Sequence, residues 1–459
     1  MREVEVFACL FAGLTWILWL QKREKLQKIG RLIAFISLLI MILHGVVEGA
    51  RWSLLPLYGV IVLGVMMGWR EKRSRLTFAG MIGMLLLSAV LSVLFPVGQM
   101  PKPTGRYSIG TVTYDRIDKG RQEAYTEAVG DERKIKIQLW YPAETVEGLD
   151  LVPWLVEGRP VARALAKEMK LPTFALDQTA LVKSHAYDSA PISTDELAYP
   201  VVIISHGWTG FRNLHSDLAE ELASAGMIVI GIDHSYGSLI TVFNHGEVVY
   251  NLPMALPSRA ETPDFLSFAQ RLVNTYAGDI IFVLDELEDY QAGALGPNFV
   301  GKFDLDRIGV LGHSTGGGAG VEVALMDSRV QAVMGMDAWV EPIEKSLVDK
   351  GLDIPALFLR SEQWENGEND GVLLPLLEES SGPITLLQVD GTFHLDFSMA
   401  YMYSPVTSEL GITGPLNPKE SAIIQRELAR QFFERQLQES TSPWKIDQWE
   451  AVRKIYEEK

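Results

Sequence analysis

The sequence predicts a doubly wound, mostly parallel α/β domain that follows a four-helix transmembrane segment. Three observations support this prediction. Four apolar runs occupy the first 100 residues, short apolar runs alternate with helical patterns in residues 101–459, and the charge differs sharply between the two parts. Residues 1–100 hold 11 Lys and Arg against 5 Asp and Glu, whereas the rest of the chain holds 30 against 53. The acidic balance of the second part argues against nucleic acid as a partner.

The four apolar runs cover residues 4–20, 32–47, 52–69 and 76–97. Each is close to the length that an α-helix needs to cross a hydrocarbon core of roughly 30 Å. Charged residues are almost confined to the joints between the runs, where water can solvate them. We therefore expect residues 1–100 to be a membrane anchor of four spans in contact with the lipid bilayer, and residues 101–459 to be a separate domain.

The joints also predict an orientation. The first and third joints are basic, whereas the second has only Glu48 and Arg51. By the positive-inside rule the basic joints face the cytoplasm, so residues 101–459 are expected on the extracytoplasmic side of a multi-pass protein of the cell membrane. The basic residues are Lys22, Arg23, Lys25, Lys28, Arg31, Arg70, Lys72, Arg73 and Arg75.

Residues 101–459 alternate between strand and helix patterns. Residues 134–140 alternate polar and apolar side chains, which predicts a half-buried edge strand. Apolar runs typical of buried parallel strands occupy residues 201–205, 227–233, 307–311, 330–337, 354–359 and 384–389. Helical patterns occupy residues 213–224, 263–290, 315–326, 372–379 and 418–438. This alternation predicts the doubly wound sheet.

Two stretches fall outside the alternation. Residues 143–194 and 234–262 hold pieces of helix and loop, which we expect to cover the carboxyl edge of the sheet. Ligands bind at that edge in open α/β sheets. Residues 442–459 have the pattern of an amphipathic helix, which we expect to pack on the domain.

A glycine-flanked serine is the candidate nucleophile. The pentapeptide GHSTG, centred on Ser314, joins the predicted strand 307–311 to the predicted helix 315–326. This pattern is typical of a nucleophile elbow, in which a strained turn lifts the serine hydroxyl above the sheet and glycines let strand and helix approach. The turn also brings the Thr315 N–H and the positive end of the helix close to a developing oxyanion.

The serine hydroxyl needs a base, because it is almost wholly protonated at neutral pH, and the base needs a carboxylate that fixes its tautomer. In folds with this elbow the chain order is serine, acid, histidine. His394 is the only histidine after Ser314, so we predict that it is the base. Asp337 and Glu362 each follow a predicted strand between the two, and position alone does not separate them as the acid.

A second oxyanion donor is expected from the loop after an earlier strand. The predicted strand 201–205 is followed by His206, Gly207 and Trp208. Gly207 permits the turn, and Trp208 offers its backbone N–H. His206 comes before the nucleophile, in the wrong place for a base in this topology, so we expect it to pack under the loop.

Six ordered segments of the chain resemble the plasma-type platelet-activating factor acetylhydrolases and their bacterial relatives. They lie within residues 135–398, and together they are far more specific than the serine elbow alone. The segments are QLWYP, IISHGWTGFR, LASAGMIVIGIDHSYGS, RIGVLGHSTGGG, GMDAWVEP and GTFHLDF.

The resemblance implies an α/β-hydrolase fold and ester hydrolysis. In that family the acid follows the strand directly after the nucleophile helix, within a D-A-W motif, which implies Asp337 rather than Glu362. The resemblance also implies an oxyanion hole made by the N–H groups of Trp208 and Thr315. The family commonly has Leu and Phe at these last two positions, and four membrane spans are not part of its pattern, so the acyl pocket and the substrate stay open.

We therefore expect a membrane-anchored serine ester hydrolase with the catalytic residues Ser314, Asp337 and His394, acting on short-acyl lipid or phospholipid esters. The sequence has no H-E-x-x-H or P-loop pattern, and the chemistry needs no metal or cofactor. One alternative is a catalytically inactive hydrolase fold that serves as a sensor or binding module on a membrane anchor. Another is a small transporter with a regulatory domain, against which the scarcity of charge inside the runs argues.

Overall fold

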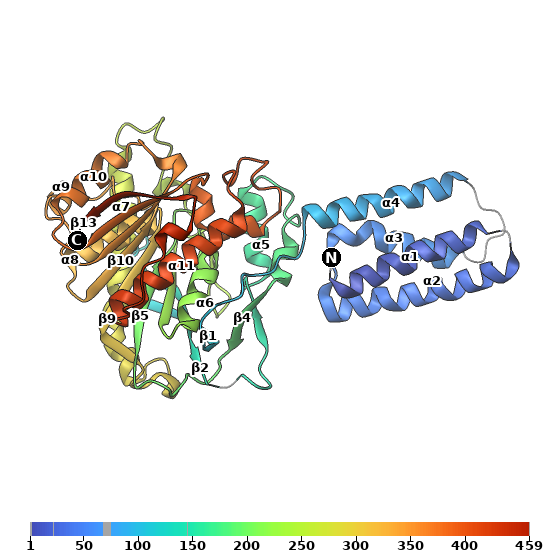
Figure 1. Ribbon diagram of the computed structural model, residues 1–459, viewed down its shortest axis with the longest axis horizontal. Helices are drawn as coiled ribbons and strands as arrows, with labels where there is room; N and C mark the ends of the chain where they lie inside the picture. Colours follow the sequence, from blue (N-terminus) through green and yellow to red (C-terminus); the bar gives the residue numbers. More distant parts are fainter. Residues whose placement is uncertain (1, 22, 68–74, 145, 459) are drawn as a thin grey trace. The chain divides into compact units, whose positions relative to one another are not determined.

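The computed structural model describes residues 2–21, 23–67, 75–144 and 146–458 (Figure 1). The chain divides into two compact units. The first contains Met1–Gln99, Pro153–Val182 and Met402–Val406. The second contains Met100–Val152, Lys183–Tyr401 and Thr407–Lys459.

Four apolar helices make up most of the first unit. They are α1 (Glu3–Leu20), α2 (Glu24–His44), which continues as the π-helical turn η1 (Gly45–Gly49), α3 (Leu55–Met67), which follows the 3-10 turn η2 (Trp52–Leu54), and α4 (Arg75–Leu94). By length and composition α1, α2 with η1, and α4 could each cross a membrane, whereas α3 is shorter within the described residues. The predicted end of the third run at Trp69 and the predicted cytoplasmic residues Lys22, Arg70, Lys72 and Arg73 lie outside the described residues.

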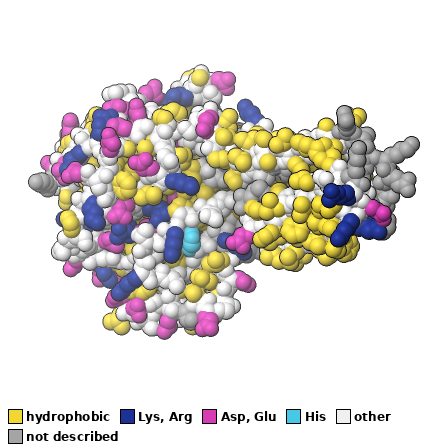
Figure 2. All heavy atoms as spheres, turned by 45° about the vertical axis from the view of Figure 1, so that its right-hand side comes forward, with side chains coloured by type: hydrophobic (Ala, Val, Ile, Leu, Met, Phe, Trp, Pro, Cys, Tyr) yellow, Lys and Arg dark blue, Asp and Glu magenta, His cyan; other side chains and the backbone are white. Residues whose placement is uncertain are grey.

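Helices α1 and α2 bury several small side chains, and the helices of the first unit expose many large apolar ones. Buried positions include Ala8, Ala12 and Ala34, together with two tryptophans of α1. Figure 2 shows hydrophobic side chains covering the helices of this unit on the face in view. Large side chains that are more than half exposed include Phe7, Leu10, Ile17, Leu32, Phe35, Val46 and Leu86. An apolar exterior with small residues between the helices is what a bundle in lipid requires.

A segment from later in the chain belongs to the same unit. It contains α5 (Arg159–Glu168) and the 3-10 turn η3 (Asp177–Leu181). The Trp52 indole N–H donates to the Ala175 carbonyl at 3.2 Å, and the Trp52 ring meets Phe174 edge-on with centroids 5.3 Å apart. These contacts hold the segment against the start of α3.

An 11-stranded mixed sheet forms the second unit. Its strand order is β13-β12-β11-β10-β9-β5-β6-β2-β1-β4-β3. The six strands from β12 to β6 are parallel, and β13 and β2 flank them in the antiparallel direction. The strands are β1 (Ser108–Gln122), β2 (Glu132–Ala143), β3 (Leu151–Pro153), β4 (Lys183–Asp188), β5 (Tyr199–Ser205), β6 (Ile228–His234), β9 (Phe303–His313), β10 (Val330–Met336), β11 (Ala356–Ser361), β12 (Ile384–Val389) and β13 (Val452–Glu458), with β7 (Ile240–Val242) and β8 (Val248–Tyr250) in a separate hairpin.

Helices cover both faces of this sheet, as a buried parallel sheet requires. Alternate residues of each central strand enter one of two apolar clusters, so that Val201 packs toward α7 and α8 whereas Val202 packs toward α6 and α11. The helices are α6 (Ser216–Ser224), α7 (Phe265–Ala292), α8 (Thr315–Met326), α9 (Lys345–Val348), α10 (Asp370–Glu379) and α11 (Pro418–Leu437), and the 3-10 turns are η4 (Arg212–His215), η5 (Pro253–Ala255), η6 (Pro297–Phe299), η7 (Glu362–Trp364), η8 (His394–Phe397), η9 (Met399–Met402) and η10 (Ile446–Gln448).

The strand order reverses between β5 and β9. The chain passes from β5 outward to β6 on one side, and from β9 outward through β10 and β11 to β12 on the other. The loops that leave β5 and β9 at their carboxyl ends therefore diverge, and such a switch point opens a crevice for a ligand in doubly wound sheets. Ser205 pairs with Gly312 at this point, so the two loops begin side by side.

The fold differs from the sequence prediction in three places. Residues 452–458 form strand β13 against β12, where the amphipathic pattern predicted a helix. The strand predicted at the sheet edge, β2, lies between β6 and β1, because β1 was not predicted and covers it. Two stretches, residues 143–194 and 234–262, were expected to cover the carboxyl edge. Residues 234–262 bond to the loop after β5, whereas residues 183–188 of the other stretch form β4, parallel to β1.

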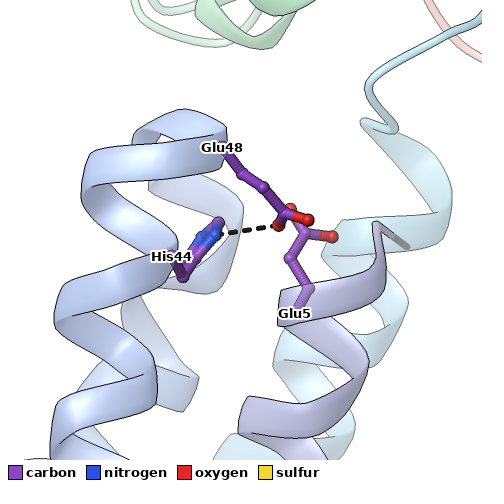
Figure 3. A group of neighbouring side chains, drawn as sticks. All are labelled: Glu5, His44 and Glu48. Carbon is purple, nitrogen blue, oxygen red and sulfur yellow. Dashed lines mark hydrogen bonds and ion pairs between the residues drawn. The ribbon is translucent and has the colours of Figure 1, made fainter.

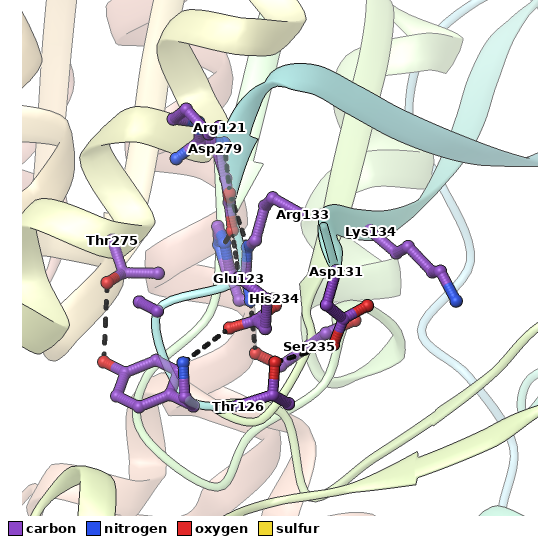
Figure 4. Close-up of polar contacts among 12 residues, drawn as sticks. Arg121, Glu123, Thr126, Asp131, Arg133, Lys134, His234, Ser235, Thr275 and Asp279 are labelled. Carbon is purple, nitrogen blue, oxygen red and sulfur yellow. Dashed lines mark hydrogen bonds and ion pairs between the residues drawn. The ribbon is translucent and has the colours of Figure 1, made fainter. Parts of the chain in front are cut away.

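A buried network of charged side chains joins β2, β6 and α7 (Figure 4). Asp279 accepts hydrogen bonds from Arg133 Nε at 3.0 Å and Nη2 at 2.6 Å, and from His234 Nδ1 at 2.9 Å. Glu123 accepts from Arg133 Nη1 at 2.8 Å, and none of these four side chains is more than 2% exposed. The other ring nitrogen of His234 accepts from the Ser205 hydroxyl at 2.9 Å, so the network supports the end of β5.

The Asp279 carboxylate stays charged inside this network. Burial alone would raise the pKa of Asp279, but Arg133 and His234 hold this pKa well below its ordinary value. Folding thus lowers the pKa of Asp279, so its contribution to stability is present above the unfolded-state pKa of about 4 and is lost as the pH falls below that value.

We expect Asp279→Asn to destabilise the chain by about 3–5 kcal/mol at pH 7, because Arg133 then keeps a buried charge with only one carboxylate partner. Thermal unfolding of the full chain in detergent, followed by circular dichroism, should show a clearly lower midpoint. The difference from wild type should shrink at about pH 3, where the carboxylate contribution is being lost.

The matched control is Asp349→Asn, which breaks the exposed ion pair between Lys345 and Asp349. Exposed pairs of this kind contribute little, so the control should leave the unfolding midpoint unchanged. Equal effects of the two substitutions would contradict the role assigned to the buried network.

Candidate active site

Ser314, the serine predicted as nucleophile, lies in a strained turn between β9 and α8. Its backbone has φ 55° and ψ −122°, a conformation that serine rarely adopts. A β-carbon on Gly312 would clash with the carbonyl of Gly316, so the turn admits only glycine there. The Ser314 N–H donates to the Met336 carbonyl at 3.0 Å, and the Ser314 carbonyl accepts from the Trp339 N–H at 2.9 Å. These bonds fix the turn against the end of β10.

His394 and Asp337 are hydrogen-bonded to each other. His394 Nδ1 donates to Asp337 Oδ2 at 2.9 Å. The fully buried Asp337 carboxylate also accepts from the Ser361 N–H at 2.7 Å and from the Ser361 hydroxyl at 2.6 Å. The carboxylate therefore orients the imidazole and holds the proton on Nδ1, which leaves the lone pair on Nε2. The His394 side chain keeps 24% of its surface exposed, so the ring is accessible.

The alternative acid, Glu362, has a different partner. Its carboxylate accepts from the Gly391 N–H at 2.6 Å. Among the described residues, Asp337 is the one whose carboxylate bonds the His394 ring. The geometry thus separates the two carboxylates that position along the chain left equal.

The loop that carries His394 lies against the serine turn. His313, the residue before Ser314, donates from Nε2 to the His394 carbonyl at 3.1 Å. The rings of His313 and His394 are 4.6 Å apart between centroids. Because Met336 pairs with His313, Asp337 and Ser314 follow neighbouring strands at the same edge of the sheet. All three predicted catalytic residues therefore lie at the carboxyl ends of the central strands.

The loop after β5 also lies against the nucleophile. A β-carbon on Gly207 would be 2.8 Å from Ser314 Cβ and 3.3 Å from Ser314 Oγ. The loop then turns through the half-buried Trp208, and the Gly210 N–H closes the turn on the Gly207 carbonyl at 2.9 Å. Thr315 is the first residue of α8, so its N–H has no acceptor within the helix. Trp208, one of the two residues predicted for the oxyanion hole, thus follows Gly207, which lies against Ser314. Thr315, the other, directly follows Ser314.

Two buried histidines, His206 and His234, lie at the start of this loop, with their rings in contact. His206 donates from Nδ1 to the next carbonyl at 2.7 Å and accepts from the Ser238 hydroxyl at 2.8 Å on Nε2. Burial lowers the pKa of His206 well below its ordinary value, so the ring is neutral. Ser205, His234 and Asp279 repeat the residue types of a triad, but all three are fully buried, so this serine cannot meet a substrate.

A second group of titratable side chains lies in the first unit. The side-chain ligand atoms of Glu5, His44 and Glu48 lie close enough together to bind one metal ion (Figure 3). Glu5, however, accepts from Arg51 Nε at 2.9 Å and Nη2 at 2.8 Å, and from Arg2 Nε at 2.9 Å. Because these cations already neutralise the carboxylate, we interpret the group as an ion-pair network. Glu5 lies at the start of the first apolar run and is fully buried.

A family model matches most of the chain. Its description is "Platelet-activating factor acetylhydrolase, isoform II", and the match covers residues 93–459. The chain belongs to this family. The resemblance seen in the sequence motifs is therefore confirmed, and the named relatives in the family are carboxylic ester hydrolases.

Individual relatives of this family member are identical to it at about a quarter of the aligned residues. The platelet-activating factor acetylhydrolase of Canis lupus familiaris is 25% identical over 292 residues, which is 59% of this chain and 62% of the relative. That of Bos taurus is 26% identical over 309 residues, 60% and 63% of the two chains. A probable 1-alkyl-2-acetylglycerophosphocholine esterase of Arthroderma benhamiae is 28% identical over 182 residues, 38% and 41%. The chain thus spans about two fifths to three fifths of the length of these relatives.

A solved esterase has the same fold. The ferulic acid esterase from Streptomyces cinnamoneus superposes with a TM-score of 0.64 and 25% identity, covering 78% of this chain and 99% of its own. This likeness and the mixed sheet support the predicted α/β-hydrolase fold.

Three residues that contact Asp337 or His394 were not predicted from the sequence. Ser361 holds Asp337, while Gln363 and Trp364 contact His394 itself. Their only signal in the sequence is that they end or follow a buried strand, β11, whose carboxyl end lies at the same sheet edge as the serine turn.

We expect Gly207→Ala to lower kcat/KM for an activated ester by about 100-fold or more. The added methyl group would lie 2.8 Å from Ser314 Cβ, so either the serine turn or the oxyanion loop must move. The measurement is the hydrolysis of p-nitrophenyl acetate by the full chain.

The matched control is Gly371→Ala on the exposed start of α10, where an added β-carbon meets no heavy atom within 4 Å. This variant should keep wild-type kinetics. A Gly207→Ala variant that is folded and fully active would contradict the close approach of the two loops.

Proposed function

We propose that this family member is a membrane-anchored carboxylic ester hydrolase in which Ser314 is the nucleophile, His394 the base and Asp337 the acid. The observation that carries the proposal is the hydrogen bond of 2.9 Å between His394 and the buried Asp337, next to a serine in an elbow with φ 55°. A nucleophile, a base and a carboxylate that orients the base are what acyl transfer requires.

The first half of the reaction forms an acyl-enzyme. His394 Nε2 takes the proton of Ser314 Oγ as that oxygen attacks the ester carbonyl carbon. The carbonyl oxygen becomes an oxyanion, which accepts hydrogen bonds from the backbone N–H groups of Trp208 and Thr315. His394 then gives its proton to the alkoxide as the carbon–oxygen bond of the alcohol breaks. Each oxyanion donor of this kind typically contributes about 100- to 1,000-fold to the rate.

The second half releases the acid. Water attacks the acyl carbon, and His394 Nε2 takes the water proton. The bond from Ser314 Oγ to the acyl carbon breaks, and the proton returns to the serine. Asp337 stays ionised throughout and stabilises the imidazolium that forms twice per cycle. Every proton in this cycle moves between Ser314, His394, the alcohol and water, so the chain's own side chains suffice.

The anchor and the relatives' names support a lipid ester as the substrate. A 1-alkyl-2-acetylglycerophosphocholine esterase is among the relatives, and that name specifies an acetyl ester of a phospholipid. Three apolar helices of a length that can cross a membrane would keep the catalytic unit near lipids. We propose residues 1–100 as the anchor and residues 101–459 as the catalytic domain, on the extracytoplasmic side as the basic joints predict.

We expect the full chain in detergent to hydrolyse p-nitrophenyl acetate with a kcat/KM at least about tenfold higher than p-nitrophenyl octanoate, because a pocket shaped for an acetyl group excludes added methylenes. Ser314→Ala and His394→Ala should lower kcat by at least about 10,000-fold on either ester, and Asp337→Asn by a similar factor. The measurement is the initial rate of p-nitrophenol release.

Glu362→Gln distinguishes the two carboxylates. It keeps an acceptor for the Gly391 N–H and should lose less than about tenfold in kcat. A larger loss from Glu362→Gln than from Asp337→Asn would overturn the assignment of the acid. A preference for octanoate would overturn the short-acyl substrate class, and an inactive wild-type chain would favour the sensor or binding-module alternative.

A further inference from the structure

All three residues of the 3-10 turn η7 contact the loop that carries His394. Glu362 accepts from the Gly391 N–H at 2.6 Å, and the Gln363 N–H donates to the Thr392 carbonyl at 3.3 Å. The Gln363 side-chain Oε1 accepts from the His394 N–H at 2.7 Å. The turn therefore bonds to three of the four consecutive residues from Gly391 to His394.

The third residue, Trp364, lies flat on the imidazole of His394. The two rings are 4.5 Å apart between centroids, and their planes differ by 2°. His313 contacts the same ring, at a centroid distance of 4.6 Å and an interplanar angle of 35°. Parallel stacking this close restricts the rotation of the imidazole about its side-chain torsions.

We propose that η7 is a positioning clamp for the base, in which Trp364 stacks on the His394 imidazole and stabilises its protonated form. The inference rests on the proposed function, in which His394 is the base, and adds to it a residue that acts through His394. Trp364 is a positioning residue, since its contact is with the base.

The physical basis is the attraction between a cation and the face of an aromatic ring. The indole of tryptophan has the strongest such attraction among the protein side chains, at about 0.5–1 kcal/mol in exposed sites and about 2 kcal/mol in desolvated ones. Imidazole is neutral before the reaction and carries a charge once it has taken the serine proton. A contact that favours the charged ring thus stabilises the state that forms during acyl transfer more than the state before it.

Other titratable groups lie on the elements packed around His394. Asp337 on the end of β10 bonds the ring directly, and Asp396 lies two residues further along η8. Glu362 in η7 bonds the backbone of the loop. Burial lowers the pKa of His313 well below its ordinary value, so that ring stays neutral and does not add a second charge beside His394. None of these groups changes when Trp364 is replaced.

The experiment compares the full chain in detergent with Trp364→Leu and Trp364→Phe. Histidine labelled with carbon-13 at Cε1 reports the protonation of each ring by NMR, and His394→Gln identifies the His394 signal. We expect Trp364→Leu to lower the protonation midpoint of His394 by about half to one pH unit, with Trp364→Phe in between. The acid limb of kcat/KM for p-nitrophenyl acetate should move by the same amount, and kcat should fall about three- to tenfold.

The control is Trp444→Leu, which removes a tryptophan that packs on Phe432, outside the His394 loop. It should move neither the midpoint nor the acid limb. A folded Trp364→Leu chain with an unchanged His394 midpoint would overturn the proposal, even if its kcat were lower. The NMR midpoint of His394 does not depend on turnover. If the chain hydrolyses no ester but Trp364→Leu still lowers this midpoint, the proposed function is refuted and the stabilisation of His394 by Trp364 still holds.

Discussion

The sharp backbone turn at Ser314 is the constraint on which the rest of the site depends. A serine at φ 55° is strained, and the turn persists because β9 and α8 hold it on both sides. Gly312 lets β9 approach α8, and Gly316 lets α8 approach the end of β5, because a β-carbon on either glycine would clash with backbone atoms there. Since β9 lies beside β5 where the strand order reverses, the same turn brings the serine against Gly207. One local backbone conformation thus sets the position of the proposed nucleophile and of the loop that we propose holds the oxyanion.

Asp279 and Asp337 are buried carboxylates that each bond a histidine, and their surroundings suit them to different tasks. Asp279 faces Arg133 as well as His234, so a permanent cation balances its charge and the network is structural. Within the described residues Asp337 bonds His394 and the neutral N–H and hydroxyl of Ser361. Its negative charge therefore remains available to stabilise an imidazolium that forms only during a reaction.

Local patterns predicted the parts of the fold that local physics determines. The elbow at Ser314 and the buried strands could be read from glycine spacing and apolar runs. Residues 452–458 formed a strand because pairing with β12 outweighed their amphipathic helix pattern, and β1 was missed because it is largely polar. Position alone left Asp337 and Glu362 equal because both follow neighbouring strands; the D-A-W motif favoured Asp337, and side-chain contacts across the sheet edge agree with it. Glu5 was unremarkable in the sequence because its partner Arg51 lies 46 residues away.

The central claim is that a single activated serine at the carboxyl end of β9 performs acyl transfer. Reaction of the full chain with a fluorophosphonate, followed by peptide mass spectrometry, tests it most directly, because such probes modify only serines whose hydroxyl is activated by a base. We expect one adduct, on the peptide that contains Ser314, and no adduct after replacement of His394 by alanine. Modification of a different serine, or none in a folded wild-type chain, would contradict it.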